Sequence, residues 1–222
     1  HRFGLRRPGK PRPLLSHSFP ADKEMLVGAN ALHQSMLWEK TACRFGLNLP
    51  VQFDPFLAKD ITLTRGKLGV VLGSSNNPAK RWSREKWTEL CSLFLKSESS
   101  IRIFLYGTTK DMKDASQIVS ELGGERVCSL AGKTNLKDLA LEFSSCSMII
   151  GCDSGGVHLA NALGIKTAVL FGPTNQQITK PCYASPLLII QPEDSADGDV
   201  LEMSSIMPPA VFNRCDSFLH EQ

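Results

Sequence analysis

The sequence has little of what marks membrane, nucleic-acid-binding or exported proteins. Among its 222 residues, no apolar run approaches the roughly 20 residues that a membrane-spanning helix requires. The formal net charge of +3 is too small to indicate a nucleic-acid surface over the whole chain. The sequence contains no signal-peptide pattern, and we therefore expect a cytoplasmic protein.

The cysteines form neither a metal-binding nor a disulfide pattern. There are seven, at positions 43, 91, 128, 146, 152, 182 and 215. Because no C-x-x-C pair and no paired histidine ligands occur, a zinc site is not expected. An odd number of cysteines without a regular framework indicates reduced thiols.

Two familiar nucleotide-binding fingerprints are also missing. No G-x-G-x-x-G follows any expected strand, so a dinucleotide-binding domain is not supported. The segment Gly132-Lys133-Thr134 resembles the end of a P-loop, but Val127 stands where the first glycine of that loop is needed. A nucleotide, if one binds, is therefore held by some other arrangement.

What the sequence does contain is a regular alternation of strands and helices from Leu68 onward. Short apolar segments suit buried strands at 68–72, 101–106, 127–130, 148–150, 167–171 and 187–190. Helical spacing lies between them at 84–96, 110–122 and 135–145, in the helix that carries His158, and finally at 210–219. Since hairpin signals are absent, this pattern predicts an α/β fold: a Rossmann-like parallel sheet with helices on both faces.

The first 67 residues look different, and we expect them to be the remnant of another domain. A helix is expected from Lys23 to Phe45, stopped by Gly46, with no run of strands before it. Residues 48–67 are expected to form a linker. The basic residues that crowd the first twelve positions are either a solvated end, which we favour, or a contact for an anionic surface. The expected domains are thus 1–67 and 68–222.

Three loops at the carboxyl ends of the expected strands carry candidate binding residues, because open α/β sheets bind ligands at that edge. In the first loop, Ser74, Ser75 and Lys80 would suit a pyrophosphate; the alternative is a solvated turn. In the second, Asp111 either meets a ribose or base or complements a helix dipole.

The third loop is the turn Asp153-Ser154-Gly155-Gly156, which runs from a buried strand into a helix. The backbone amides at its helix end would suit phosphate oxygens. Asp153 either accepts hydrogen bonds from sugar hydroxyls or caps the helix, and His158 is either a phosphate donor or structural. Thr174, after the next strand, is a further candidate donor.

Five segments together resemble a known family. They are K-R-W-S-R-E-K-W (80–87), L-Y-G-T-T-K-D (105–111), L-A-G-K-T-N-L-K-D-L-A (130–140), G-C-D-S-G-G-V-H-L-A-N-A-L-G (151–164) and L-F-G-P-T (170–174). In order and spacing they are similar to the ADP-heptose:lipopolysaccharide heptosyltransferases, glycosyltransferases of family 9. The resemblance covers about Leu68 to Pro173, and no single segment would be specific by itself.

The resemblance implies a GT-B architecture whose C-terminal domain binds an ADP-sugar donor. The donor diphosphate would be held by Ser74, Ser75, Lys80, Ser154, Gly155, Gly156 and His158. Asp111, Lys133 and Thr134 would lie at the nucleoside, and Asp153 would meet the donor sugar. The implied reaction inverts the anomeric centre and needs no metal or cofactor. Its partners are the nucleotide sugar and a lipid-linked saccharide at the membrane, and no nucleic acid.

The resemblance is incomplete at the front of the chain. His1-Arg2-Phe3-Gly4 resembles a strand end deep within the family's acceptor domain, so the stretch that bears the catalytic base is expected to be missing. No residue of this chain is therefore assigned as the base. Two alternatives stay open: a non-catalytic nucleotide-sugar-binding module, and a sugar-nucleotide epimerase of similar architecture.

Overall fold

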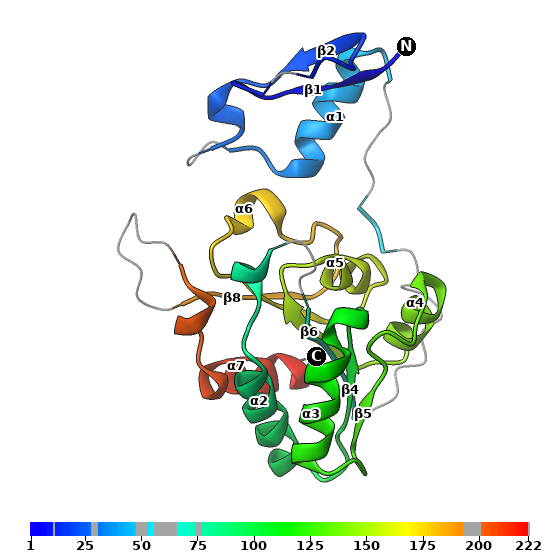
Figure 1. Cartoon of the computed structure of the whole chain (residues 1–222), viewed down its shortest axis with the longest axis vertical. Coiled ribbons are helices and arrows are strands. Elements are labelled where there is room, and N and C mark those ends of the chain that lie inside the picture. Colours follow the sequence, from blue (N-terminus) through cyan, green and yellow to red (C-terminus); the bar gives the residue numbers. More distant parts are fainter. Residues whose placement is uncertain are drawn as a thin grey trace. The chain divides into compact units, whose positions relative to one another are not determined.

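The computed structural model describes residues 1–10, 12–27, 31–47, 53–55, 66–73, 77–192 and 201–221. It separates into two compact units, His1–Gln52 with Asn175–Lys180, and Phe53–Thr174 with Pro181–Gln222 (Figure 1). Most of the expected linker at 48–67 lies outside the described residues. The division into domains at residue 67 stays a prediction.

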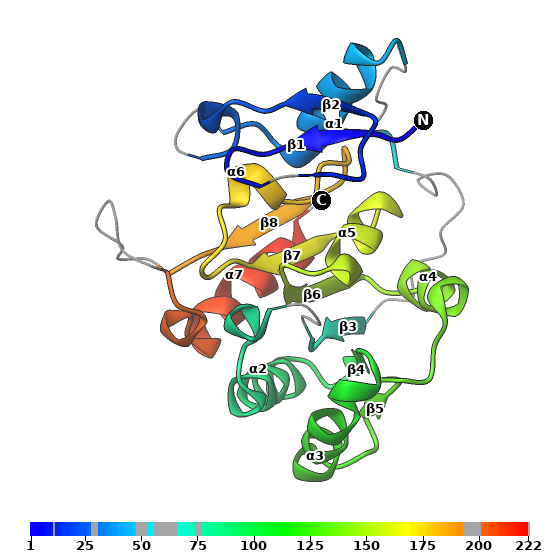
Figure 2. The ribbon, with the colours of Figure 1, turned by 45° about the horizontal axis from the view of Figure 1, so that its top comes forward.

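The larger unit contains a six-stranded parallel sheet, as expected (Figure 2). The strands lie in the order β5-β4-β3-β6-β7-β8. They are β3 (Lys67–Val71), β4 (Arg102–Tyr106), β5 (Val127–Ser129), β6 (Met148–Cys152), β7 (Thr167–Leu170) and β8 (Leu187–Ile190). Strand β3 pairs with β4 on one side and with β6 on the other, so the strand order reverses between β3 and β6. Ligands of open α/β sheets bind beside such a reversal.

Helices connect the strands close to the expected positions. The α-helices of this unit are α2 (Arg84–Ser97), α3 (Met112–Leu122), α4 (Leu136–Ser144), α5 (Gly155–Ala162) and α7 (Pro208–His220). Short 3₁₀ helices are η2 (Pro78–Lys80), η3 (Thr109–Asp111) and η4 (Met203–Ser205). Ser83 is the N-cap of α2, and its hydroxyl accepts a hydrogen bond from the Lys86 amide at 3.3 Å.

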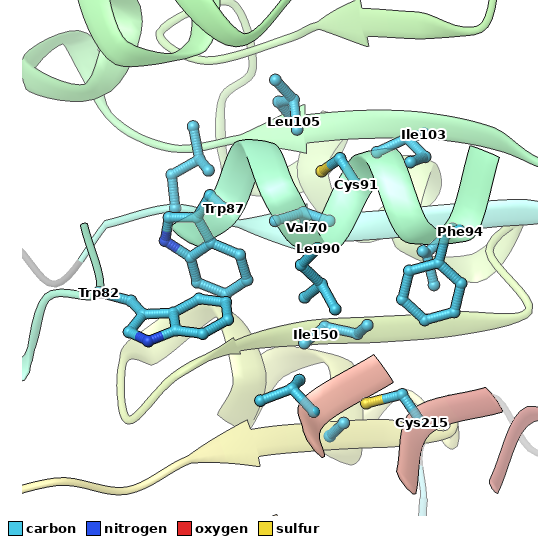
Figure 3. Packing of buried hydrophobic residues seen from close by; sticks show 14 of the residues in the cluster. Val70, Trp82, Trp87, Leu90, Cys91, Phe94, Ile103, Leu105, Ile150 and Cys215 are labelled. Carbon is cyan, nitrogen blue, oxygen red and sulfur yellow. The ribbon is translucent and has the colours of Figure 1, made fainter. Parts of the chain in front are cut away.

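Helix α2 packs against the sheet through a buried apolar face. Its apolar residues recur at helical spacing, so that Trp87, Leu90, Cys91 and Phe94 all face the sheet (Figure 3). The Trp82 and Trp87 rings meet edge to face with centroids 4.8 Å apart. Burial of Leu90 and of Phe94 contributes roughly 1.5–3 kcal/mol each relative to exposure.

Both faces of the sheet are covered, which confirms the expected fold class. Helices α2, α3 and α7 share one buried cluster with the strands, including Val70, Ile118 and Cys215. Helices α4 and α5 share a second cluster with the other face, including Phe143 and Ala160. Successive strand residues thus point into different layers, as the period of two requires.

The smaller unit differs from expectation in two respects. Its elements are β1 (Phe3–Arg6), β2 (His17–Pro20), η1 (Lys23–Met25), α1 (Gln34–Arg44) and α6 (Gln176–Thr179). No run of strands was expected before residue 67, but two short strands, β1 and β2, pair there in parallel.

The helix expected from Lys23 to Phe45 is also wrong in its first half. Helix α1 begins only at Gln34, where the imidazole of His33 accepts a hydrogen bond from the Ser35 amide and caps the helix. The poor helix former Gly28 precedes this cap in the sequence. The expected stop is confirmed, since Gly46 adopts a φ of 82°.

Within the part of the chain that the structure describes, none of the helices has both the length and the apolar character needed to cross a membrane.

Candidate functional site

The loops that follow β3, β6 and β7 bring four of the candidate side chains together. Asp153 lies at the centre, immediately after β6. The ammonium of Lys80, at the end of η2, donates to Asp153 Oδ2 at 2.6 Å, and the Thr174 hydroxyl donates to the same oxygen at 3.0 Å. His158, on the first turn of α5, places Nε2 3.7 Å from Asp153 Oδ1. Lys80 thus joins residues that lie 73 to 94 positions further along the sequence in one cluster beside the point where the strand order reverses.

Asp153 is ionised in this cluster. Burial raises its pKa, since the side chain is only 5% exposed, but His158, Lys80 and Thr174 together lower the pKa to about 2. At 3.7 Å the His158 nitrogen is beyond hydrogen-bond distance, so the 2.6 Å contact with Lys80 is the stronger of the two. The carboxylate is therefore a permanent acceptor at neutral pH.

The lowered pKa makes stability depend on pH in acid. Because the folded pKa of about 2 lies below the ordinary value of 3.8, Asp153 contributes stability above pH 4 that is lost as the pH falls through 2. The contribution is about 2 kcal/mol, from 1.4 kcal/mol per pKa unit. We expect Asp153→Asn to be less stable than the unaltered chain at pH 7, by an amount that shrinks between pH 4 and 2. Urea unfolding followed by tryptophan fluorescence measures this.

The control for this prediction is Asp114→Asn, which changes an aspartate whose side chain is 40% exposed. Its unfolding midpoint should follow that of the unaltered chain at every pH. A constant difference between Asp153→Asn and the unaltered chain across the acid range would contradict the assigned pKa.

The amino-terminal end of α5 lies directly after Asp153 in the chain. Ser154 is the N-cap residue in an extended conformation, and its buried hydroxyl has no hydrogen-bond partner among the described residues. A Cβ placed on Gly155 would meet no atom within 4 Å, whereas one on Gly156 would lie 3.0 Å from Val71. The first-turn amides of a helix carry partial positive charge and lack partners within the helix. This end of α5 therefore has the donors and the space that an anion requires.

Asp111 is bound within the protein. Its Oδ2 accepts from the amide and the hydroxyl of Thr108 at 2.8 and 2.9 Å, and its Oδ1 lies 2.8 Å from the Arg81 guanidinium. A Cβ on Gly73 or Gly107 would lie within 3 Å of the Asp111 side chain, so both backbones pass close against it. The structure shows Asp111 capping a helix, and its expected contact with a nucleoside stays a prediction.

The remaining candidates lie at the end of β5 or outside the described residues. Lys133 is exposed and donates to the carbonyl of Ser129 at 3.0 Å, and Thr134 next to it is half-buried. Ser74 and Ser75 lie outside the described residues. Among the residues that are described, no group of three or more His, Cys, Asp or Glu side chains could hold a metal ion.

The ion pair between Arg81 and Asp111 was not anticipated from the sequence. It ties the first loop to the second directly beside Lys80, and a weaker contact at 3.5 Å joins Arg81 to Asp114. The sequence signal is slight: a second cation follows Lys80, and a second carboxylate lies three residues after Asp111. The bond from Thr174 to Asp153 has no signal beyond the position of Thr174 at a strand end.

Comparison with known proteins gives a consistent result. The model of glycosyltransferase family 9 (heptosyltransferase) matches residues 24–202. Lipopolysaccharide heptosyltransferase 2 of Salmonella typhimurium is 26% identical over 224 residues, which cover 95% of this chain and 63% of the relative. The chain thus spans less than two thirds of that relative's length.

Solved structures share the fold. A family 9 glycosyl transferase from Veillonella parvula superposes with a TM-score of 0.72 at 20% identity, over 95% of this chain and 65% of that one. The E. coli ADP-heptose lipopolysaccharide heptosyltransferase II gives a TM-score of 0.61 at 24% identity, over 82% and 50%. With the family model matching most of its length, the chain belongs to glycosyltransferase family 9, the heptosyltransferase family.

Proposed function

We propose that this chain forms the donor-binding part of a glycosyltransferase that moves a heptose, or a related sugar, from an ADP-activated donor to a lipopolysaccharide core acceptor. The observation that carries the proposal is the cluster of Lys80, Asp153 and His158 beside the open end of α5. It combines the Lys80 ammonium, the His158 imidazole and the helix amides for a diphosphate with one ionised acceptor for sugar hydroxyls. The names of the family and of the relatives support the same reaction class.

In the proposed complex, the diphosphate replaces Asp153 as the partner of Lys80. The charge-assisted hydrogen bond from Lys80 to a carboxylate is then exchanged for one to a phosphate, so the ammonium loses little interaction energy. His158 and the amides of α5 meet the remaining phosphate oxygens. Asp153, released from the ammonium, accepts hydrogen bonds from the sugar hydroxyls.

The chemical step would be an inverting displacement. An acceptor hydroxyl attacks the anomeric carbon as the bond to the diphosphate breaks, and the diphosphate leaves with the electron pair. Lys80, His158 and the end of α5 stabilise the charge that develops on it, which is an electrostatic role. In this proposal these groups act without a metal, and the acceptor proton passes to a general base that is not assigned to any residue of this chain.

The acceptor in this proposal is a lipid-linked saccharide. The enzyme would therefore work in the cytoplasm, at the surface of the membrane that carries the acceptor. Binding of the donor does not depend on that surface and can be measured alone.

The test is isothermal titration of the full chain with ADP-heptose, ADP and UDP. We expect binding of the first two and markedly weaker binding of Asp153→Ala to ADP-heptose. If the folded chain bound neither ADP-heptose nor ADP, that result would contradict the proposal. Product analysis with donor alone tests the epimerase alternative, which would convert the sugar.

A sharper variant is Gly155→Ala. In the free chain the added methyl group meets no atom within 4 Å, so stability should change by less than about 0.5 kcal/mol. In the complex it would stand where phosphate oxygens approach the helix amides, so ADP affinity should fall at least about tenfold. Titration and urea unfolding measure the two effects.

The matched control is Gly124→Ala, whose added methyl would lie 3.6 Å from Val119, an ordinary packing distance, in the turn after α3. It should alter neither ADP affinity nor stability appreciably. Unchanged ADP affinity in Gly155→Ala would mean that the open end of α5 is not the phosphate site.

A further inference from the structure

Thr174 lies in the loop that follows β7. The segment that leads to it is held closely, because a Cβ on Gly172 would lie 2.7 Å from the Met203 sulfur and 3.0 Å from the Met203 backbone nitrogen. Phe171 before it is fully buried. The Thr174 hydroxyl thus starts from a backbone that has little room to shift.

The Thr174 hydroxyl and the Lys80 ammonium bond to the same oxygen of Asp153. Their distances to Oδ2 are 3.0 and 2.6 Å, while Oδ1 lies on the side of His158. Two hydrogen-bond donors on one oxygen restrict the rotation of the carboxylate.

Donor binding would remove one of these two bonds. Under the proposed function, Lys80 turns to the diphosphate, while the Thr174 hydroxyl continues to donate to Asp153 Oδ2. Loss of the Thr174 bond would give the carboxylate more rotational freedom, and the sugar hydroxyls would have to order it at a greater entropic cost.

We propose that Thr174 is a positioning residue that aims the Asp153 carboxylate at the donor sugar. It acts through Asp153 rather than on the phosphates. Its effect therefore falls on the preference of the site for a sugar nucleotide over the bare nucleoside diphosphate. This inference rests on the proposed function and assigns to Thr174 a part of its donor specificity.

The experiment compares Thr174→Val and Thr174→Ser in the full chain by titration with ADP and ADP-heptose. Valine keeps the volume of threonine but removes the hydroxyl, and serine keeps the hydroxyl. We expect the valine variant to bind ADP-heptose about tenfold more weakly, the range of a hydrogen bond to a charged group, with ADP affinity changed less than about twofold. The serine variant should restore the preference for ADP-heptose.

The control is Thr88→Val, since the Thr88 hydroxyl donates to the Arg84 carbonyl within α2. It should leave both affinities unchanged. An equal loss of both affinities in Thr174→Val would assign Thr174 a purely structural role, and unchanged affinities would assign it none; either result overturns the inference. If the unaltered chain binds neither ligand, the proposed function itself fails, and the inference fails with it.

Discussion

Replacing Lys80 by alanine is expected to weaken the binding of ADP to this chain about 100-fold. The ammonium pairs with the Asp153 carboxylate at 2.6 Å, and the Lys80 side chain is 20% exposed, so a ligand can reach it. Loss of one partner from a hydrogen-bonded charge pair in a desolvated site costs about 2–5 kcal/mol. Titration of Lys80→Ala with ADP at fixed ionic strength measures the effect.

The matched control is Lys96→Ala, which removes the same charge from the exposed end of α2. It should bind ADP within about twofold of the unaltered chain, because exposed charges are screened by salt. Equal losses in the two variants would mean that only net charge matters. No loss in either would remove Lys80 from the phosphate site.

Lys80→Ala should also change stability, and this effect reports the pairing of Lys80 with Asp153 separately from its binding of phosphate. Without the ammonium, Asp153 keeps Thr174 and His158 but loses its shortest contact, so its pKa should rise from about 2 toward the ordinary value. The stability of Lys80→Ala should therefore begin to fall at a higher pH than that of the unaltered chain. Binding and acid stability thus report the same contact by independent measurements.

The sheet could be predicted from the sequence because its strands and helices carry their own pattern. Strand β6, MIIGC, is buried at every residue, and α2 repeats apolar residues at 87, 90, 91 and 94. The strands of the smaller unit lack such a pattern. In β1, FGLR, only Leu5 is buried, and β2, HSFP, contains no buried residue. A four-residue segment with at most one buried side chain cannot be told from a loop by its sequence pattern.

The site was predictable only in outline. All carboxyl ends of a parallel sheet meet at one edge, so the loops bearing Lys80, Asp153 and Thr174 had to lie near one another. Which side chains bond across the loops depends on their reach and on the backbone of each turn. The pairing of Arg81 with Asp111 is of this kind, since it needs two glycine backbones to pass close to the carboxylate.

That pairing leads to the largest expected change in stability. Asp111→Ala should lower the free energy of unfolding of the larger unit by about 3 kcal/mol, because it leaves Arg81 without its closest partner and removes the helix cap at Thr108. We choose the lower end of the range for a broken buried pair since the Arg81 side chain is 28% exposed. Urea unfolding followed by the fluorescence of Trp82 and Trp87 measures it.

Asp114→Ala is the control, because its carboxylate is the more distant partner of Arg81, at 3.5 Å, and is 40% exposed. It should cost less than about 0.5 kcal/mol. If Asp111 served only as a nucleoside ligand, Asp111→Ala would weaken ADP binding and leave stability unchanged. If Asp111 instead holds the loops after β3 and β4 together through Arg81, the variant should lose stability. Its ADP affinity should then fall as well, because Arg81 adjoins Lys80. A stable Asp111→Ala variant with normal ADP affinity would rule out both roles.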